Sequence, residues 1–173
     1  MPERLPIYIN PERAVARGLE ASGSFKLEKM DRLRDRLLSP YGEVNVALQF
    51  GAEGKRKYLK GHIVGEMILE CQRCMSDMKM VVDHSFRLGF IQSEAEIDAL
   101  LPGEEPLMVN NEDLFIADII EDELELLLPM VVMHDPGSCE ANVLSAIEEE
   151  PEEEPVIEDK RPNPFAVLVD LKK

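Results

Sequence analysis

The sequence of 173 residues has no tryptophan, and aromatic residues make up only 5% of it. A hydrophobic core built by this chain must therefore consist mainly of aliphatic side chains and methionine. No apolar run approaches the roughly 20 residues that a helix needs to cross a membrane. The N-terminal residues include no apolar stretch after their charges, so we expect no signal peptide, no membrane association and a cytoplasmic protein.

Sequence motifs of known catalytic sites are missing as well. The chain has no glycine-rich phosphate loop, no His-Glu-x-x-His motif and no nucleophile elbow. The run Glu121-Asp122-Glu123 offers carboxylates for acid–base chemistry, but such a run on a helix is usually a solvated face. His62 and His84 have no evident partners, and we expect them to face solvent or to have no specific role. We therefore predict that the protein is not an enzyme.

Positive charge is absent from a long part of the chain. Residues 88–159 contain 22 Asp and Glu and no Lys or Arg, whereas residues 1–87 contain 15 basic and 12 acidic residues. Such a segment repels phosphates and attracts basic proteins. We expect RNA to be bound at most indirectly, because affinity for nucleic acid comes mainly from Lys and Arg. The alternative interpretation is an acidic surface that only keeps the protein soluble.

The three cysteines are spaced in a pattern typical of metal binding. Cys71 and Cys74 stand between two runs of alternating hydrophobic residues, and Cys139 follows His134 by five positions. Three thiolates and one imidazole form a complete tetrahedral ligand set for one structural zinc ion. Arg73, inside the loop, would compensate the excess negative charge. The alternatives are unrelated reduced cysteines or, less favoured because the pair lies between strands, a redox-active site.

Alternating hydrophobic residues predict a sheet over residues 44–49, 58–70 and 78–90. Only the cysteine loop joins the last two runs, so we expect them to form a long antiparallel hairpin. We also expect a turn at residues 51–54, and bulges or close backbone approach at Gly61 and Gly65. Helices are predicted over residues 11–17 (N-cap Asn10, stop Gly18), 28–38, 94–101 and 114–128 (N-cap Asp113). The expected fold class is α+β: an antiparallel sheet built on the central hairpin, with flanking helices.

The composition divides the chain into three parts. Residues 1–140 are predicted to form a single α+β domain, and residues 141–159 an acidic, flexible and disordered linker, because glutamates and prolines dominate the second half of that segment. Residues 160–173 are apolar again. Asn163 and Pro164 are typical of a helix start, and Phe165 begins a short apolar face. We expect this C-terminal tail to dock on its own domain or on a partner.

Four motifs resemble, in the same order, those of the YceD family. They are Cys71-Gln72-Arg73-Cys74, Glu121-Asp122-Glu123-Leu124 running into Leu128-Pro129, His134 with Cys139, and Arg161-Pro162-Asn163-Pro164-Phe165-Ala166-Val167-Leu168. The resemblance spans about residues 5 to 172. It implies a role in synthesis, processing or stability of the 23S rRNA of bacteria, in many of which the family's gene precedes one for a small basic protein of the large ribosomal subunit. It implies no active-site residues.

Charge and resemblance together predict a non-enzymatic factor in 23S rRNA accumulation or large-subunit assembly. It would bind a basic ribosomal protein or assembly partner. The candidate partner-binding residues are Arg73, Glu121, Asp122, Glu123, Asn163, Pro164 and Phe165. The alternative is a direct rRNA-binding module that uses cations of the Lys55–Lys60 region beside Arg73, namely Lys55, Arg56, Lys57 and Lys60.

Overall fold

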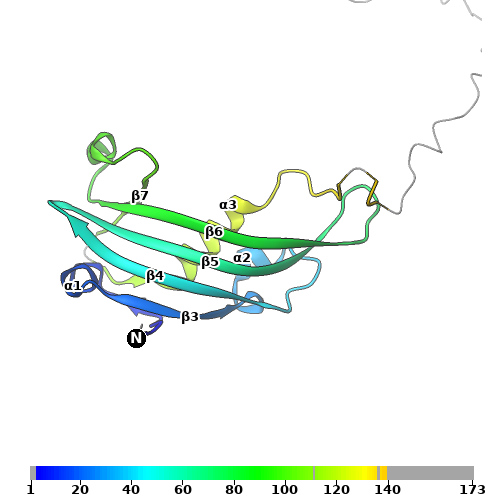
Figure 1. Cartoon of the computed structure of the whole chain (residues 1–173), viewed down its shortest axis with the longest axis horizontal. Coiled ribbons are helices and arrows are strands. Elements are labelled where there is room, and N and C mark those ends of the chain that lie inside the picture. The colour runs from blue at the N-terminus through cyan, green and yellow to red at the C-terminus, as the bar shows by residue number, and fades with distance from the viewer. Residues whose placement is uncertain (1–2, 111, 136, 140–173) are drawn as a thin grey trace, which may run out of the picture. The chain divides into compact units, whose positions relative to one another are not determined.

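The computed structural model describes residues 3–110, 112–135 and 137–139, and a long, mostly antiparallel sheet lies at its centre (Figure 1). The strand order is β1-β3-β4-β5-β6-β7. The strands are β1 (Glu3–Arg4), β3 (Glu20–Lys26), β4 (Glu43–Glu53), β5 (Arg56–Glu70), β6 (Asp77–Ile91) and β7 (Glu105–Met108). A separate two-stranded sheet pairs β2 (Tyr8–Ile9) with β8 (Leu114–Phe115). The predicted α+β fold with a central antiparallel hairpin is confirmed.

The predicted linker, 141–159, and the predicted docking segment, 160–173, lie outside the described residues and stay predictions. Within the part that the structure describes, no helix is both long enough and apolar enough to span a membrane.

The central hairpin is longer than the sequence pattern indicated. β5 and β6 pair without a break from Tyr58 opposite Gly89 to Glu70 opposite Asp77. The turn expected at residues 51–54 was placed too early. β4 continues to Glu53, and the chain turns at Gly54, which has a φ of 65°. With a rise of about 3.3 Å per residue, β5 separates this turn from the cysteine loop by about 50 Å.

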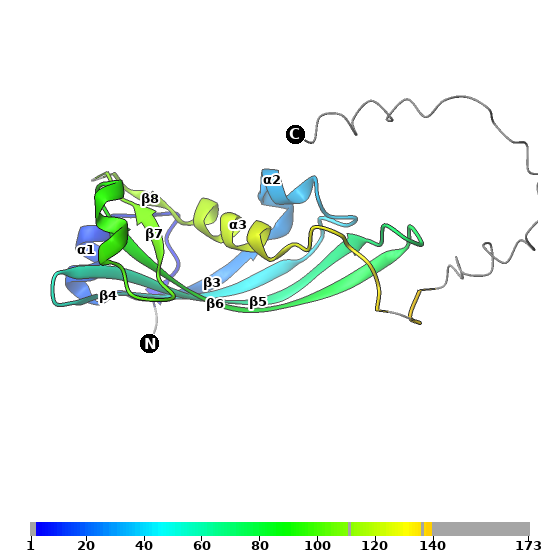
Figure 2. The same cartoon turned by 90° about the horizontal axis from the view of Figure 1, so that it is seen from above.

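In the part of the chain that the structure describes, α2 (Asp31–Arg34) and α3 (Ile116–Leu127) cover one face of the sheet, and the opposite face is called the open face. Figure 2 shows the two helices on the same side of the strands. The covered face is mainly aliphatic, as the shortage of aromatic residues predicts. Its fully buried side chains include Val44, Leu59, Ile63, Met67, Ile116, Ile120 and Leu124. Each such aliphatic side chain contributes about 2 kcal/mol by leaving water.

Gly61 lets a large side chain lie flat against the sheet. It pairs with Phe86, whose ring occupies the space that a side chain on residue 61 would need. A Cβ placed there would lie 2.0 Å from Phe86 Cζ. The expected close backbone approach is confirmed at Gly61, without a bulge, since the β5–β6 register is continuous.

The helix predicted over residues 11–17 is confirmed as α1 (Pro11–Arg17). The Asn10 side chain accepts a hydrogen bond from the Arg13 amide at 3.1 Å, and Gly18 ends the helix in the left-handed conformation. Both ends are set by residues within one turn of the helix, which explains why the sequence was sufficient to place them.

The other predicted helices are shorter in the structure. The 28–38 prediction is replaced by a 3-10 turn, Leu27–Lys29, and the one-turn α2, and the 94–101 prediction by a 3-10 helix, η2, at Glu94–Ala99. α3 begins after residues 114–115, because they pair with β2. Asp113 does not cap it, since its carboxylate accepts a hydrogen bond from Asn10 Nδ2 at 3.1 Å.

A buried carboxylate joins α2 to α3. Glu121 is only 6% exposed, and its Oε1 accepts hydrogen bonds from the amides of Arg32 at 2.7 Å and Leu33 at 3.0 Å. Those amides lie at the N-terminus of α2, where helix N–H groups lack partners within the helix. The guanidinium of Arg32 also contacts Asp122 Oδ1 at 2.5 Å. The acidic run of α3 thus helps to hold the short helix.

We predict that Glu121→Ala lowers the free energy of unfolding by about 2 kcal/mol, because two amides lose a charged acceptor. The neighbouring exposed substitution Asp122→Ala is the control and should change stability little. Urea unfolding of both variants, followed by circular dichroism, measures the difference. Equal stabilities for the two variants would contradict the capping role of Glu121.

Candidate metal centre

The loop between β5 and β6 is a tight turn that brings the side chains of Cys71 and Cys74 close together. The Cys71 amide donates to Ser76 O at 2.9 Å, and the Met75 amide donates to Cys71 O at 2.8 Å. Met75 adopts a left-handed conformation, with φ of 59°. These bonds fold the chain back on itself, so that Cys74 comes close to Cys71 at the end of the hairpin.

The segment that follows α3 lies against this loop. The Gln72 amide donates to Val132 O at 2.8 Å, and His134 Nε2 is hydrogen-bonded to Asp77 O at 3.1 Å. Because Asp77 holds Nε2, the other ring nitrogen of His134 is directed towards Cys74. Residues 130–133 form no helix or strand. The chain bends at Met130 and Val131, and the contact of Val132 with the loop brings the following residues, His134 and Cys139, to it.

The four predicted ligands meet in this Cys/His cluster. Their ligand atoms all lie within 4.8 Å of one another. Cys71 Sγ is 3.8 Å from Cys139 Sγ, and Cys74 Sγ is 3.4 Å from His134 Nδ1. A tetrahedral zinc ion with bonds of about 2.3 Å to sulfur separates its sulfur ligands by about 3.8 Å. The cluster can therefore hold a metal ion, and zinc is the ion that its donor set favours.

Hydrogen bonds favour the thiolate form of Cys71 and Cys74, which is the form that binds a metal. Burial by itself would raise the pKa of Cys71, but backbone groups of His134, Cys74 and Arg73 bond to its sulfur and lower the pKa to about 5. The side chain and backbone of Ser76 lower the pKa of Cys74. Burial, followed by hydrogen bonding to Cys74, raises the pKa of the Cys139 thiol.

Arg73 faces inward, towards the cluster. Its Nη2 donates to His134 O at 3.1 Å, and hydrogen bonding to Cys139 raises the pKa of its guanidinium. Its Nε is buried and has no hydrogen-bond partner among the described residues. This placement agrees with the predicted role of Arg73 in compensating thiolate charge, whereas its predicted contact with a partner stays untested.

The acidic run of α3 is partly internal. Glu123 is 4% exposed, and its Oε2 lies 3.1 Å from His84 Nε2. Burial raises the pKa of Glu123, and the hydrogen bond to His84 opposes that rise. Of the three predicted partner-binding acids, only Asp122 is exposed.

His84 is only partly exposed, and its contact with Glu123 shows that the expectation of no partner was wrong for this residue. The signal was present in the sequence, because His84 shares the strand alternation of Val82 and Phe86, which face the core. His62 is exposed, as expected, although its Nε2 contacts Asp83 Oδ1 at 2.8 Å.

The cations proposed for RNA binding do not form one patch. Lys57 makes an ion pair with Glu12, and Lys60 lies over the Tyr58 ring at 4.9 Å from its centroid. Both belong to the end of β5 that is far from Arg73. The structure therefore does not bring Arg73 beside the Lys55–Lys60 region.

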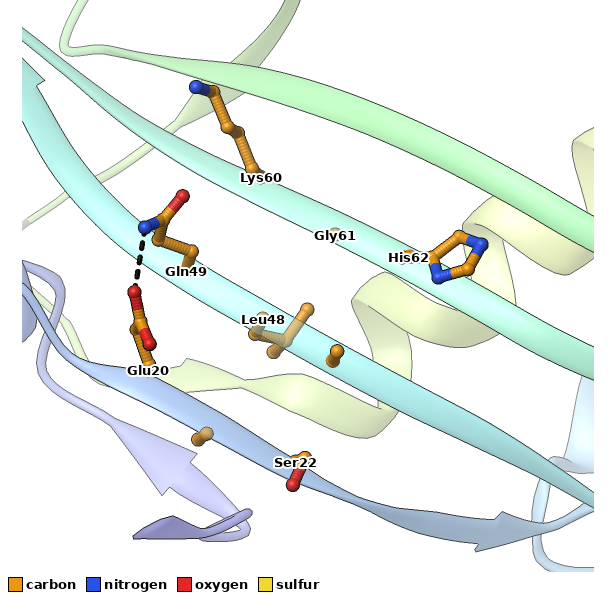
Figure 3. A pocket seen from close by; sticks show the side chains of 9 residues that line it. Glu20, Ser22, Leu48, Gln49, Lys60, Gly61 and His62 are labelled. Carbon is orange, nitrogen blue, oxygen red and sulfur yellow. Dashed lines mark hydrogen bonds between the residues drawn. The ribbon is translucent and has the colours of Figure 1, made fainter. Parts of the chain in front are cut away.

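The open face of the sheet carries a shallow pocket of about 400 Å³ over β3, β4 and β5 (Figure 3). Gln49 Nε2 donates to Glu20 Oε1 at 2.8 Å on its floor, and Lys60 points away from this pair. His62 also lines the pocket, but its ring is bonded to Asp83 and not to Ser22, the one hydroxyl side chain of the lining. This arrangement offers no hydrogen-bonded nucleophile and base.

Comparisons with known proteins place these features in one family. Residues 59–172, which include all four candidate ligands, match the family described as "Large ribosomal RNA subunit accumulation protein YceD". A protein of the same name from Haemophilus influenzae is 29% identical over 172 residues, which cover 98% of this chain and 97% of the relative. No solved structure matches.

We predict that the chain, purified without chelator, carries about one zinc ion and that Cys74→Ser loses the metal. Its melting temperature should fall as well, because the loop and the segment after α3 lose their link. Elemental analysis and thermal unfolding measure the two effects. Gln72→Ala, an exposed change in the same loop, is the control and should keep the metal. Metal-free protein with three freely titratable thiols would contradict the prediction.

Proposed function

Because the chain belongs to the YceD family, we propose that it is a non-enzymatic factor in the accumulation of 23S rRNA and the assembly of the large ribosomal subunit. Its activity is binding: it holds a basic ribosomal protein or assembly partner until the RNA takes that protein over. The observation that carries this proposal is the absence of Lys and Arg from residues 88–159, which contain 22 acidic residues.

Several acids of the described part of that segment lie on the surface. Asp118 and Asp122 are exposed on α3, and Glu94, Glu96 and Asp98 are exposed on η2. A field of one sign steers an oppositely charged partner towards the surface and speeds the encounter. Because salt screens exposed charges beyond about 8–10 Å, the proposed complex weakens as ionic strength rises.

The Cys/His cluster supports a structural role for the metal in this proposal. Four protein ligands complete a tetrahedral site and leave no position for a substrate or a water molecule, which is typical of structural zinc. The ion would link the segment that follows α3 to the loop at the end of the β5–β6 hairpin. It would thereby keep the acidic surface in a fixed relation to the sheet.

Direct binding of rRNA receives less support from the structure. Four of the five cations that it requires lie in or just before the first third of β5, whereas Arg73 lies beyond its other end, more than about 30 Å from Lys60. Lys57 is already paired with Glu12, which lowers the positive charge available for phosphates. We therefore propose that the rRNA finally binds the partner protein and that this chain does not bind the rRNA directly.

We predict salt-sensitive binding to a basic protein of the large subunit. The triple variant Asp118→Asn, Asp122→Asn, Glu125→Gln should bind about three- to tenfold more weakly at low salt and about equally at high salt. A matched variant in the front half, Glu28→Gln, Asp35→Asn, Glu43→Gln, removes the same charge and should change affinity less.

The measurement is biolayer interferometry with individually purified large-subunit proteins, beside naked 23S rRNA. Firm binding of the wild type to the bare RNA at physiological ionic strength, with no binding to any of the proteins, would refute the proposal.

We further predict that deletion of residues 160–173 lowers 23S rRNA accumulation more than deletion of residues 141–159, because a docking segment makes specific contacts and a linker does not. Complementation of a strain without the gene, with rRNA measured on sucrose gradients, compares the two deletions. Equal effects would argue against docking by the C-terminal tail.

A further inference from the structure

Among the residues that the structure describes, none pairs with the outer edge of β6 over much of its length. β5 pairs with one edge of β6 from Asp77 to Gly89, whereas β7 pairs with the other edge only from Leu88 to Ile91. Figure 1 shows β6 continuing well past the end of β7. In the part of the chain that the structure describes, the His134 bond at Asp77 is the one hydrogen bond to the backbone of this edge before β7 begins.

Odd-numbered residues of β6 direct their backbone groups towards this edge. The carbonyls of Asp77 and Ile91 point away from β5, since His134 Nε2 and the Val109 amide bond to them. Every second residue of an antiparallel ladder faces the same neighbour, and the register between them has no bulge. The N–H and C=O groups of Val81 and Asp83, for example, are therefore available to an added strand.

The two sides of this edge differ in character. On the open face, Val81 is 68% exposed and is flanked by Lys79, which Glu66 already neutralises at 2.7 Å. Asp77 and Asp83 then leave this side acidic. On the covered face, Met78 and Met80 are half-buried and apolar.

α3 extends the apolar side. Glu123 contacts His84 of β6, and Leu126, three residues later, lies on the same side of the helix. Leu126 is nevertheless 72% exposed, so this large apolar side chain of α3 is left uncovered. An added strand would cover it.

We propose that residues 79–87 of β6, the free edge, bind an extended basic segment of the partner as an added strand. This inference rests on the proposed function and names the contact that it uses. Main-chain hydrogen bonds to the odd-numbered residues supply affinity, as in other cases of strand addition. Alternate side chains of the segment are apolar, towards Met80 and Leu126, and basic, towards Asp83.

Charge decides between this occupant and a second copy of the chain. Two β6 edges could pair with Val81 opposite its own copy and Lys79 opposite Asp83. However, each chain carries a net charge of −16, and the segment from residue 88 onward adds no cation before residue 160. Two such chains repel, whereas a basic segment is attracted.

Val81→Pro tests the edge directly. Proline removes an amide that points outward, so the β5–β6 ladder keeps its hydrogen bonds and the fold should survive. Val81→Thr, which keeps the amide, is the matched control. The probe is a fluorescein-labelled peptide of alternating lysine and valine, with a peptide that has proline in place of alternate valines as its inactive counterpart. By fluorescence anisotropy, Val81→Pro should bind the probe about tenfold more weakly than the wild type, and Val81→Thr within about twofold.

Hydrogen exchange keeps the test decisive even if Val81→Pro fails to fold. In the wild type, the amides of Lys79, Val81, Asp83 and Ser85 should exchange fast in the free protein and slowly when the probe peptide is bound. Amides of Met80 and Val82 should be protected in both states. Protection by the probe elsewhere, with these four unchanged, would overturn the proposal.

The experiment also separates this inference from the proposed function. If the ribosomal protein binds the wild type and Val81→Pro equally, the edge assignment fails while the proposed function stands. If no ribosomal protein binds the wild type, the proposed function fails. A wild-type dimer that Val81→Pro converts to monomer in sedimentation velocity would give the edge to a second copy and refute the proposal.

Discussion

The main-chain ladder between β5 and β6 is the constraint on which the rest of this structure depends. Its register decides which side chains meet α3, because a slip of one residue would send the whole core face of a strand into solvent. The same ladder places the cysteine loop at one end of the sheet and the cations of the Lys55–Lys60 region at the other. It also determines which backbone groups of β6 remain available at the edge.

Features set by neighbouring residues could be predicted from the sequence. The alternation of Val44, Val46 and Leu48 predicted a strand with one buried face, and Asn10 and Gly18 marked the ends of α1. The Cys/His cluster is a long-range feature, yet it was predictable too, because zinc requires about four ligands and the chain offers a matching set. The spacing of these residues does not show that they meet in space, but the preference of zinc for Cys and His ligands indicated it.

Other contacts between distant segments were not predictable. The helix expected over residues 28–38 ends early, because the chain turns back and the Leu38 amide bonds to Ile68 O at 2.9 Å. Glu121 and Glu123 looked like solvated charges, since nothing near them in sequence indicates that an amide of α2 or His84 would meet them. Buried carboxylates of this kind are recognised only when their partners are known.

The position of the Cys/His cluster along the chain has a thermodynamic consequence. Cys71 and Cys139 are 68 positions apart, and the segment between them contains β6, β7 and α3. A metal held at both ends closes this long loop and removes conformational entropy from the unfolded chain, an effect of about 4 kcal/mol for a covalent crosslink of that span. The ion would thus act as a removable crosslink, and its loss would lower the free energy of unfolding by an amount of this order.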